Sequence, residues 1–211
     1  MFAMLNEDLE TAIVKVVVAG PFAAGKTTFI SALSEIPVLT SETAVTDETS
    51  NIKDHTTVAL DFGRITVPAV DDEPAIQLYL FGTPGQDRFD FMWDIAAQGM
   101  AGLVLLVDVT APDTWDAAAR IAEYFRDASS APMVVAANRD RGDDDEIARL
   151  SERLGVSLDR VVRCQALQRD SAKVVLLHLL DALLSEGDQE AVEPATPAAG
   201  SAPTPLSRSE R

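Results

Sequence analysis

The chain has 211 residues, of which 34 are acidic and 17 are basic, so its formal net charge is −17. This length suits one α/β domain with room for a tail. We expect neither a nucleic-acid partner nor an intrinsic membrane anchor, because an acidic chain has few cations for phosphates and its apolar runs are too short to span a bilayer.

The first third of the chain predicts a strand, a helix and a long loop. Residues 12–19, "AIVKVVVA", form a nearly continuous apolar run, which is typical of a strand buried on both faces. Residues 26–36 have a helical pattern that ends at a proline. Residues 40–57 are rich in Thr, Ser and Glu and predict a long polar loop.

A hairpin and three strand–helix pairs are predicted next. Residues 58–67 and 76–82 flank the turn signal "DDEP" and predict two antiparallel strands. Further strands at 103–108, 132–137 and 160–164 alternate with helices near 113–128, 143–154 and 171–185.

A phosphate-binding loop lies between the first strand and the first helix. "GPFAAGKTT", residues 20–28, matches G-x-x-x-x-G-K-[ST]. The backbone N–H groups of such a loop surround phosphates, helped by the positive end of the helix dipole. Lys26 is expected to reach the β- and γ-phosphates, and Thr27 to offer its hydroxyl to Mg²⁺. The loop residues assigned to the nucleotide are Gly20, Phe22, Ala23, Ala24, Gly25, Lys26, Thr27 and Thr28.

Strand–helix alternation together with this loop predicts a three-layer α/β fold of the P-loop NTPase type. The expected sheet has six strands, mostly parallel with one antiparallel strand, and helices on both faces. Residues 1–11 are assigned to a lead, 12–185 to the nucleotide-binding domain and 186–211 to a disordered tail rich in Pro, Ala and Ser.

Several segments, in matching order, resemble the Ras-like small GTPases. They are "TVALDF" (57–62), "GTPGQDRF" (82–89), "GLVLLVDVT" (102–110), "AANRD" (136–140) and "CQA" (164–166). Gly82 stands where that family normally has a magnesium-sensing Asp, and this change is similar to the bacterial MglA-like and conservon branch.

The resemblance implies a small GTPase-like switch that binds GTP·Mg²⁺ and slowly hydrolyses it to GDP. Segments 40–57 and 82–94 would signal the nucleotide state to partners. Thr57 would be a second Mg²⁺ ligand, and Gly85 would donate its N–H to the γ-phosphate. Gln86 would orient the attacking water, so Lys26, Gly85 and Gln86 are the catalytic candidates.

The same resemblance assigns the base-binding residues. Asn138 lies where the N-K-x-D motif begins, and Arg139 could lie along the base. Asp140 precedes the usual Asp position by one residue, so the choice between guanine and adenine stays open. Gln165, Ala166 and Leu167 follow the strand at 160–164 and complete the set.

Two departures keep other functions open. Gly82 and the bulky Phe22 are compatible with a scaffold that holds nucleotide without turnover, and a P-loop ATPase or kinase is a further alternative. The resemblance implies a roadblock-type regulator or effector and recruitment to membranes through partners, whereas the short apolar runs and the polar start of the chain predict a cytoplasmic protein. Phe89, Phe91, Met92 and Trp93 are interpreted as a partner surface or, above all for Phe89 and Trp93, as core, and Cys164 as a buried, inert thiol.

Overall fold

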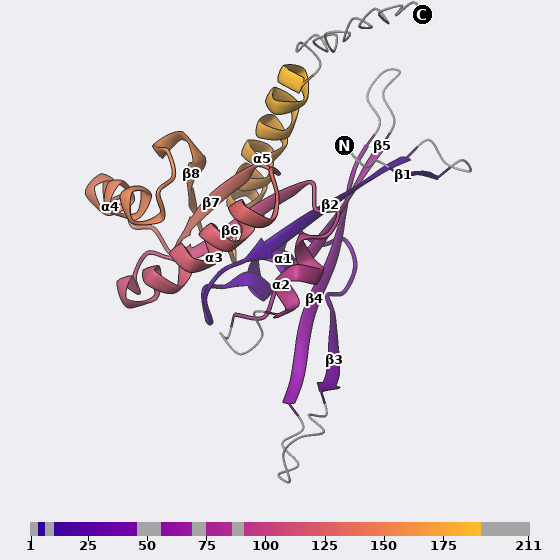
Figure 1. The fold of residues 1–211 in the computed structure, drawn as a ribbon, viewed down its shortest axis with the longest axis horizontal. Helices are drawn as coiled ribbons and strands as arrows, with labels where there is room; N and C mark the ends of the chain where they lie inside the picture. The colour runs from indigo at the N-terminus through magenta and orange to yellow at the C-terminus, as the bar shows by residue number, and fades with distance from the viewer. Residues whose placement is uncertain (1–3, 7–10, 46–55, 69–74, 86–90, 191–211) are drawn as a thin grey trace, which may run out of the picture.

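The computed structural model describes residues 4–6, 11–45, 56–68, 75–85 and 91–190 (Figure 1). Its centre is a sheet of eight strands in the order β3-β4-β5-β2-β6-β7-β8, with β1 paired to β2. The strands are β1 (Met4–Asn6), β2 (Thr11–Ala19), β3 (Leu39–Val45), β4 (Thr56–Val67), β5 (Ala75–Gly82), β6 (Gly102–Asp108), β7 (Met133–Asn138) and β8 (Val161–Cys164).

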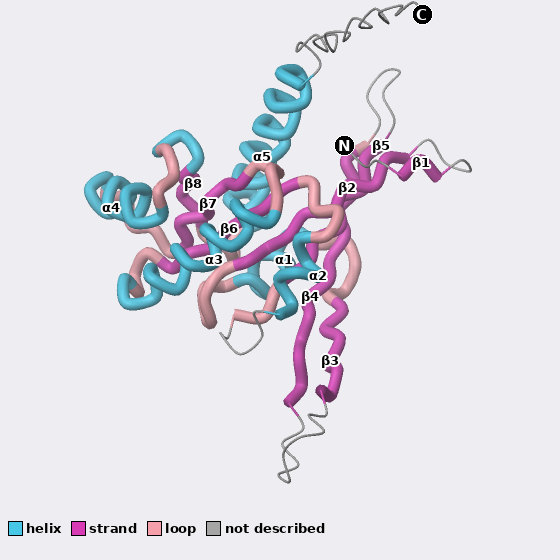
Figure 2. Tube along the Cα trace, in the orientation of Figure 1, coloured by secondary structure: helices cyan, strands magenta, loops and turns pink. Residues whose placement is uncertain are grey.

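The sheet confirms the predicted fold class, with two strands more than expected. Strands β5, β2, β6, β7 and β8 run parallel to one another, whereas β4 is antiparallel to β5. The additional strands are β1, antiparallel to β2, and β3, antiparallel to β4 (Figure 2). Residues 39–45 therefore form an edge strand, so the prediction of a loop from residue 40 was wrong for this part.

Helices cover both faces of the sheet (Figure 1). α1 (Lys26–Leu33) and α5 (Arg169–Glu190) pack on one face. α2 (Phe91–Ala97), α3 (Trp115–Ala128) and α4 (Asp144–Leu154) pack on the other, and short 3-10 turns occupy Pro112–Thr114 and Leu158–Arg160.

The period of two in the buried strands divides the core into these two layers. In β2, Val16 and Val18 belong to the layer under α1 and α5, whereas Val17 and Ala19 belong to the layer under the other three helices. Trp93 of α2 is buried beside the ring of Tyr124, at 5.1 Å between centroids. Trp93 is therefore a core residue, and Phe91 is 48% exposed.

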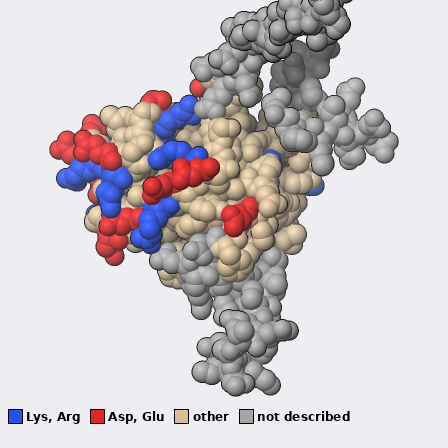
Figure 3. Space-filling view, in the orientation of Figure 1, with Lys and Arg blue, Asp and Glu red and all other residues tan. Residues whose placement is uncertain are grey.

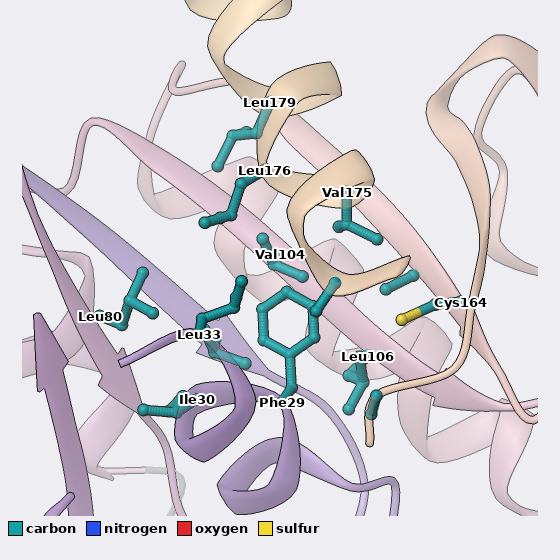
Figure 4. Close-up of a cluster of buried hydrophobic side chains, with 14 of the residues drawn as sticks. Phe29, Ile30, Leu33, Leu80, Val104, Leu106, Cys164, Val175, Leu176 and Leu179 are labelled. Carbon is teal, nitrogen blue, oxygen red and sulfur yellow. The ribbon is translucent and has the colours of Figure 1, made fainter. Parts of the chain in front are cut away.

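Figure 4 shows the buried side chains of α1 packed among those of the sheet and of α5. Phe29 is fully buried between Leu106 of β6 and the side chains of α5, among them Leu176. Burial of a large apolar side chain contributes about 1.5–3 kcal/mol. Cys164 is buried in the same layer, and burial raises the pKa of its thiol to about 11, as expected for an inert cysteine.

Charged side chains gather over α3 and α4, where acidic and basic groups are intermixed (Figure 3). Arg153 of α4 pairs with Asp116 of α3 across the surface, and Asp143 caps α4 by accepting from the amides of Asp145 and Glu146. Exposed ion pairs of this kind contribute about 0–1 kcal/mol each.

The last helix is longer than the sequence pattern indicates, since α5 continues to Glu190. In the described residues, no helix combines the length and the apolar character needed to cross a membrane. The rest of the expected tail, 191–211, lies outside the described residues.

Candidate nucleotide-binding site

The phosphate loop joins the carboxyl end of β2 to the first residue of α1. Because β5 and β6 run parallel to β2 on either side, all three strands end at the same edge of the sheet, where α/β folds bind ligands. Gly20 has a φ of 147°, and a Cβ there would overlap the carbonyl oxygen of Leu106. Gly25 has a φ of 103°, and its Cβ would lie 2.7 Å from the Asn138 amide nitrogen. Only glycine fits both positions without strain.

Lys26 lies inside the loop. Its Nζ donates to the carbonyl oxygens of Gly20 and Pro21, each at 2.8 Å, and the residue is only 9% exposed. Burial lowers the pKa of Lys26 to about 8, and the negative charge of Asp61 partly opposes this shift. The loop therefore holds a buried cation at the position where phosphates are expected.

Thr27 contacts a carboxylate from another strand. Its hydroxyl donates to Oδ2 of Asp61 at 2.5 Å, and Asp61 is a buried residue of β4. In the β4–β5 pairing, Asp61 lies directly opposite Gly82.

The segment after β5 lies against the phosphate loop. A Cβ at Gly85 would be 2.5 Å from Lys26 Nζ and 2.7 Å from the backbone nitrogen of Phe22. The Phe22 side chain itself is 68% exposed. Gly85 is therefore close enough to the loop for its backbone to meet a phosphate bound there.

Asn138 connects three loops at this edge. Its Nδ2 donates to the carbonyl of Ala24 at 2.9 Å, while its Oδ1 accepts from the amides of Arg139 and Ala166, each at 2.9 Å. The phosphate loop, residues 138–140 and residues 165–167 are thus brought together, as the sequence pattern predicts.

Two carboxylates fix the residues that follow Asn138. Arg139 has a φ of 62° and forms an ion pair with Asp108, the last residue of β6. The Asp140 carboxylate accepts from Arg163 Nη1 at 2.6 Å, which raises the pKa of Arg163. The other oxygen of Asp140, Oδ1, is buried and has no hydrogen-bond partner among the described residues.

The other residues predicted to belong to the site differ in exposure, and two of them are not fully described. Gln165 donates through Nε2 to the Asp140 carbonyl at 2.7 Å, and Leu167 is 82% exposed. Thr28 is exposed on α1, and Ala23 has a φ of 61°. Gln86 lies outside the described residues, and of Thr57 only the backbone, in β4, is described.

No group of three or more metal-ligating His, Cys, Asp or Glu residues occurs among the described residues. Mg²⁺ bound with a nucleotide does not need such a cage, because it takes one or two protein ligands and completes its shell with phosphates and water. Thr27 in the phosphate loop fits that requirement.

The family of the chain follows from comparison with known sequences. The sequence model of a family described as conserved hypothetical ATP binding protein matches residues 18–174, a span that contains the phosphate loop and the loops at 138–140 and 165–167. The chain belongs to this family. It is also similar to an uncharacterized protein of Methanocaldococcus jannaschii, with 32% identity over 98 residues. That alignment spans 46% of this chain and about half, 52%, of the relative.

Membership in this ATP-binding family corrects one expectation. The resemblance to the MglA-like and conservon branch of the Ras-like small GTPases was wrong, because the matching family is a different one. The roadblock-type partner that this resemblance implied loses its basis. What the family supports is nucleotide binding by a P-loop fold.

Sequence reasoning assigned no role to Asp61 or Asp108. Asp61 is the one acidic residue within the otherwise mostly apolar segment 58–67, and this isolated charge was the available signal; its register opposite Gly82 is seen only in the structure. Asp108 ends the strand before the loop 109–111, and its partner Arg139 ends up beside it because β6 pairs with β7.

Proposed function

We propose that this protein binds a nucleoside triphosphate with Mg²⁺ and hydrolyses it to the diphosphate, and that the nucleotide is ATP. The phosphate loop carries the proposal. It combines Gly20 and Gly25 at positive φ, a buried Lys26 cation and the amino end of α1, which together suit a polyphosphate. The family description supports ATP as the base-bearing partner.

GTP is the second candidate because of the carboxylate near the base loops. Asp140 Oδ1 is an acceptor without a partner among the described residues, and once the loop at 138–140 exposes it, it could pair with the 6-amino group of adenine or with the N1–H and 2-amino group of guanine. Asn138 supports either base by holding the loops at 138–140 and 165–167 in register with the phosphate loop.

Hydrolysis is assigned to Lys26 and Gly85, which lie together at the phosphate loop, and to Gln86, which follows Gly85 in the sequence. Lys26 supplies charge stabilisation, Gly85 an amide donor and Gln86 the orientation of water. Bound Mg²⁺, held by Thr27 and the phosphates, would neutralise the charge of the phosphate oxygens. Because the segment 82–94 begins at these residues, we also propose that its conformation depends on the nucleotide state.

Competition binding tests the choice of nucleotide. Purified protein is loaded with a fluorescent ATP analogue in Mg²⁺ and titrated with ATP, ADP, GTP and GDP. We expect the adenine nucleotides to compete at concentrations at least about tenfold lower than the guanine nucleotides, which corresponds to about 1.4 kcal/mol. Stronger competition by GTP would transfer the proposal to guanine, and no binding of any nucleotide would refute it.

Incubation of the same protein with ATP and Mg²⁺, followed by chromatography of the products, tests hydrolysis. Formation of ADP that depends on protein concentration supports the enzyme. Binding of ATP without formation of ADP would instead support the scaffold that holds nucleotide without turnover.

Nucleotide binding should weaken at alkaline pH because of Lys26. Bound phosphates favour its charged form, whereas without nucleotide its pKa lies at about 8. Protonated Lys26 is therefore lost as the pH rises above about 8, and the association constant should fall by up to about tenfold per pH unit. Binding titrations between pH 7.5 and 9.5 measure the slope of the logarithm of the association constant against pH.

The Lys26→Gln variant is the control for that slope. It has no amine to titrate, so its weaker binding should be nearly independent of pH over the same range. Equal slopes in the two proteins would show that another group is responsible.

A further inference from the structure

P-loop NTPases usually hold Mg²⁺ with a carboxylate in addition to the loop Ser or Thr, and the end of β5 offers none. Gly82 ends the strand, and no carboxylate is attached at that position. A Cβ at Gly82 would lie 2.8 Å from Ile30 Cδ1 and 3.0 Å from Asp61 Cβ. The space beside Gly82 is thus already filled, and one of the groups that fill it is the side chain of Asp61.

Asp61 reaches this space because of strand register. It lies opposite Gly82 in the antiparallel pair of β4 and β5. Side chains of directly opposed residues emerge on the same face of a sheet, and here a Cβ at Gly82 would lie only 3.0 Å from that of Asp61. An aspartate on β4 can therefore present its carboxylate where an aspartate on β5 would, provided that position 82 is glycine.

The carboxylate of Asp61 is aimed at the phosphate loop. Its Oδ2 accepts from the Thr27 hydroxyl at 2.5 Å, and the residue is only 9% exposed. A buried carboxylate in contact with the hydroxyl of G-K-T supplies the two protein oxygens that Mg²⁺ typically takes beside a triphosphate.

We propose that Asp61 is the carboxylate of the Mg²⁺ site, supplied by β4 in place of a strand-end aspartate on β5. The assignment rests on the proposed function, because the phosphates provide the remaining ligands. It explains why the chain can have glycine at position 82 and still bind a metal with its nucleotide.

The experiment measures how much Mg²⁺ tightens nucleotide binding. The dissociation constant of a fluorescent ATP analogue is determined in EDTA and in Mg²⁺ for the parent, Asp61→Asn and Asp181→Asn, an exposed aspartate of α5 that serves as the control. We expect Asp61→Asn to reduce the Mg²⁺ effect by roughly 10- to 100-fold, a range typical of altered metal sites. The ratio of the two dissociation constants isolates the metal, because the effect of the lost carboxylate charge on Lys26 and the phosphates is present in both buffers.

A swap of the two residues separates metal binding from a structural role. The double variant Asp61→Gly/Gly82→Asp has the composition of the parent but moves the carboxylate to β5. We expect it to regain most of the Mg²⁺ effect, whereas Gly82→Asp alone should be destabilised because its side chain meets that of Asp61. Electron paramagnetic resonance of bound Mn²⁺ provides a readout that does not depend on turnover.

Failure of the Asp61 assignment and failure of the proposed function give different results in these measurements. An unchanged Mg²⁺ effect in Asp61→Asn would overturn the assignment, and so would an equal loss of affinity in EDTA and in Mg²⁺. A parent protein that binds no nucleotide in either buffer would refute the proposed function, and this assignment with it.

Discussion

Replacing Lys26 by alanine should weaken triphosphate binding by at least about 100-fold. Truncation of one partner of a buried, hydrogen-bonded charge pair costs roughly 2–5 kcal/mol, and about 2.8 kcal/mol corresponds to 100-fold. Lys26 would form such a pair with the bound phosphates, because the residue is only 9% exposed and its ammonium is held in the loop by two carbonyl oxygens at 2.8 Å. The dissociation constant of a fluorescent ATP analogue, measured by titration, gives the effect.

The matched control is Lys173→Ala on α5. This side chain is exposed and pairs with Asp170 on the same helix, so its removal should change the affinity by less than about twofold. Similar losses in the two variants would indicate a general effect of the net charge rather than a phosphate contact by Lys26.

Replacing Gly20 by alanine should destabilise the folded protein by about 4 kcal/mol. The new Cβ would overlap the carbonyl oxygen of Leu106, and a φ of 147° is strained for any residue with a side chain. Strain of this kind costs about 1–3 kcal/mol, and overpacking of a core adds about 1–3 kcal/mol. Urea unfolding followed by circular dichroism measures the difference in the free energy of unfolding.

The variant Gly99→Ala separates backbone strain from the steric overlap with a neighbouring strand. Gly99 also has a positive φ, 65°, but a Cβ there would meet no atom within 4 Å. Its replacement should cost only about 1 kcal/mol, from backbone strain alone. If both variants lose the same stability, the close approach of the loop to β6 has no energetic effect.

The fold class was predictable from sequence because the strands that form the two core layers follow local apolar patterns. β6 is buried at every position, and β2 combines a run of apolar residues with a glycine-rich loop. The edge strand at 39–45 was not predictable, since "LTSETAV" lacks apolar alternation and is a strand through its backbone pairing with β4.

The candidate site was predictable wherever a loop directly follows a strand. Asn138 and residues 165–167 meet the phosphate loop because β7 and β8 end at the same edge as β2. Asp61 was missed because its contact with Thr27 depends on register between strands, which no local pattern contains. The GTPase resemblance was wrong because its short motifs describe strand ends and phosphate contacts that P-loop proteins share.

From the order of the strands we expect the two halves of the site to differ in local stability. Lys26 and Thr27 follow β2, which lies between β5 and β6 inside the sheet, whereas Asp61 belongs to β4, one strand from the edge at β3. Strands near an edge open in partial unfolding events that leave the centre intact. If Asp61 holds the metal, such an opening withdraws the carboxylate while the phosphate loop stays formed. The protein could then release Mg²⁺ before it releases the nucleotide, without global unfolding.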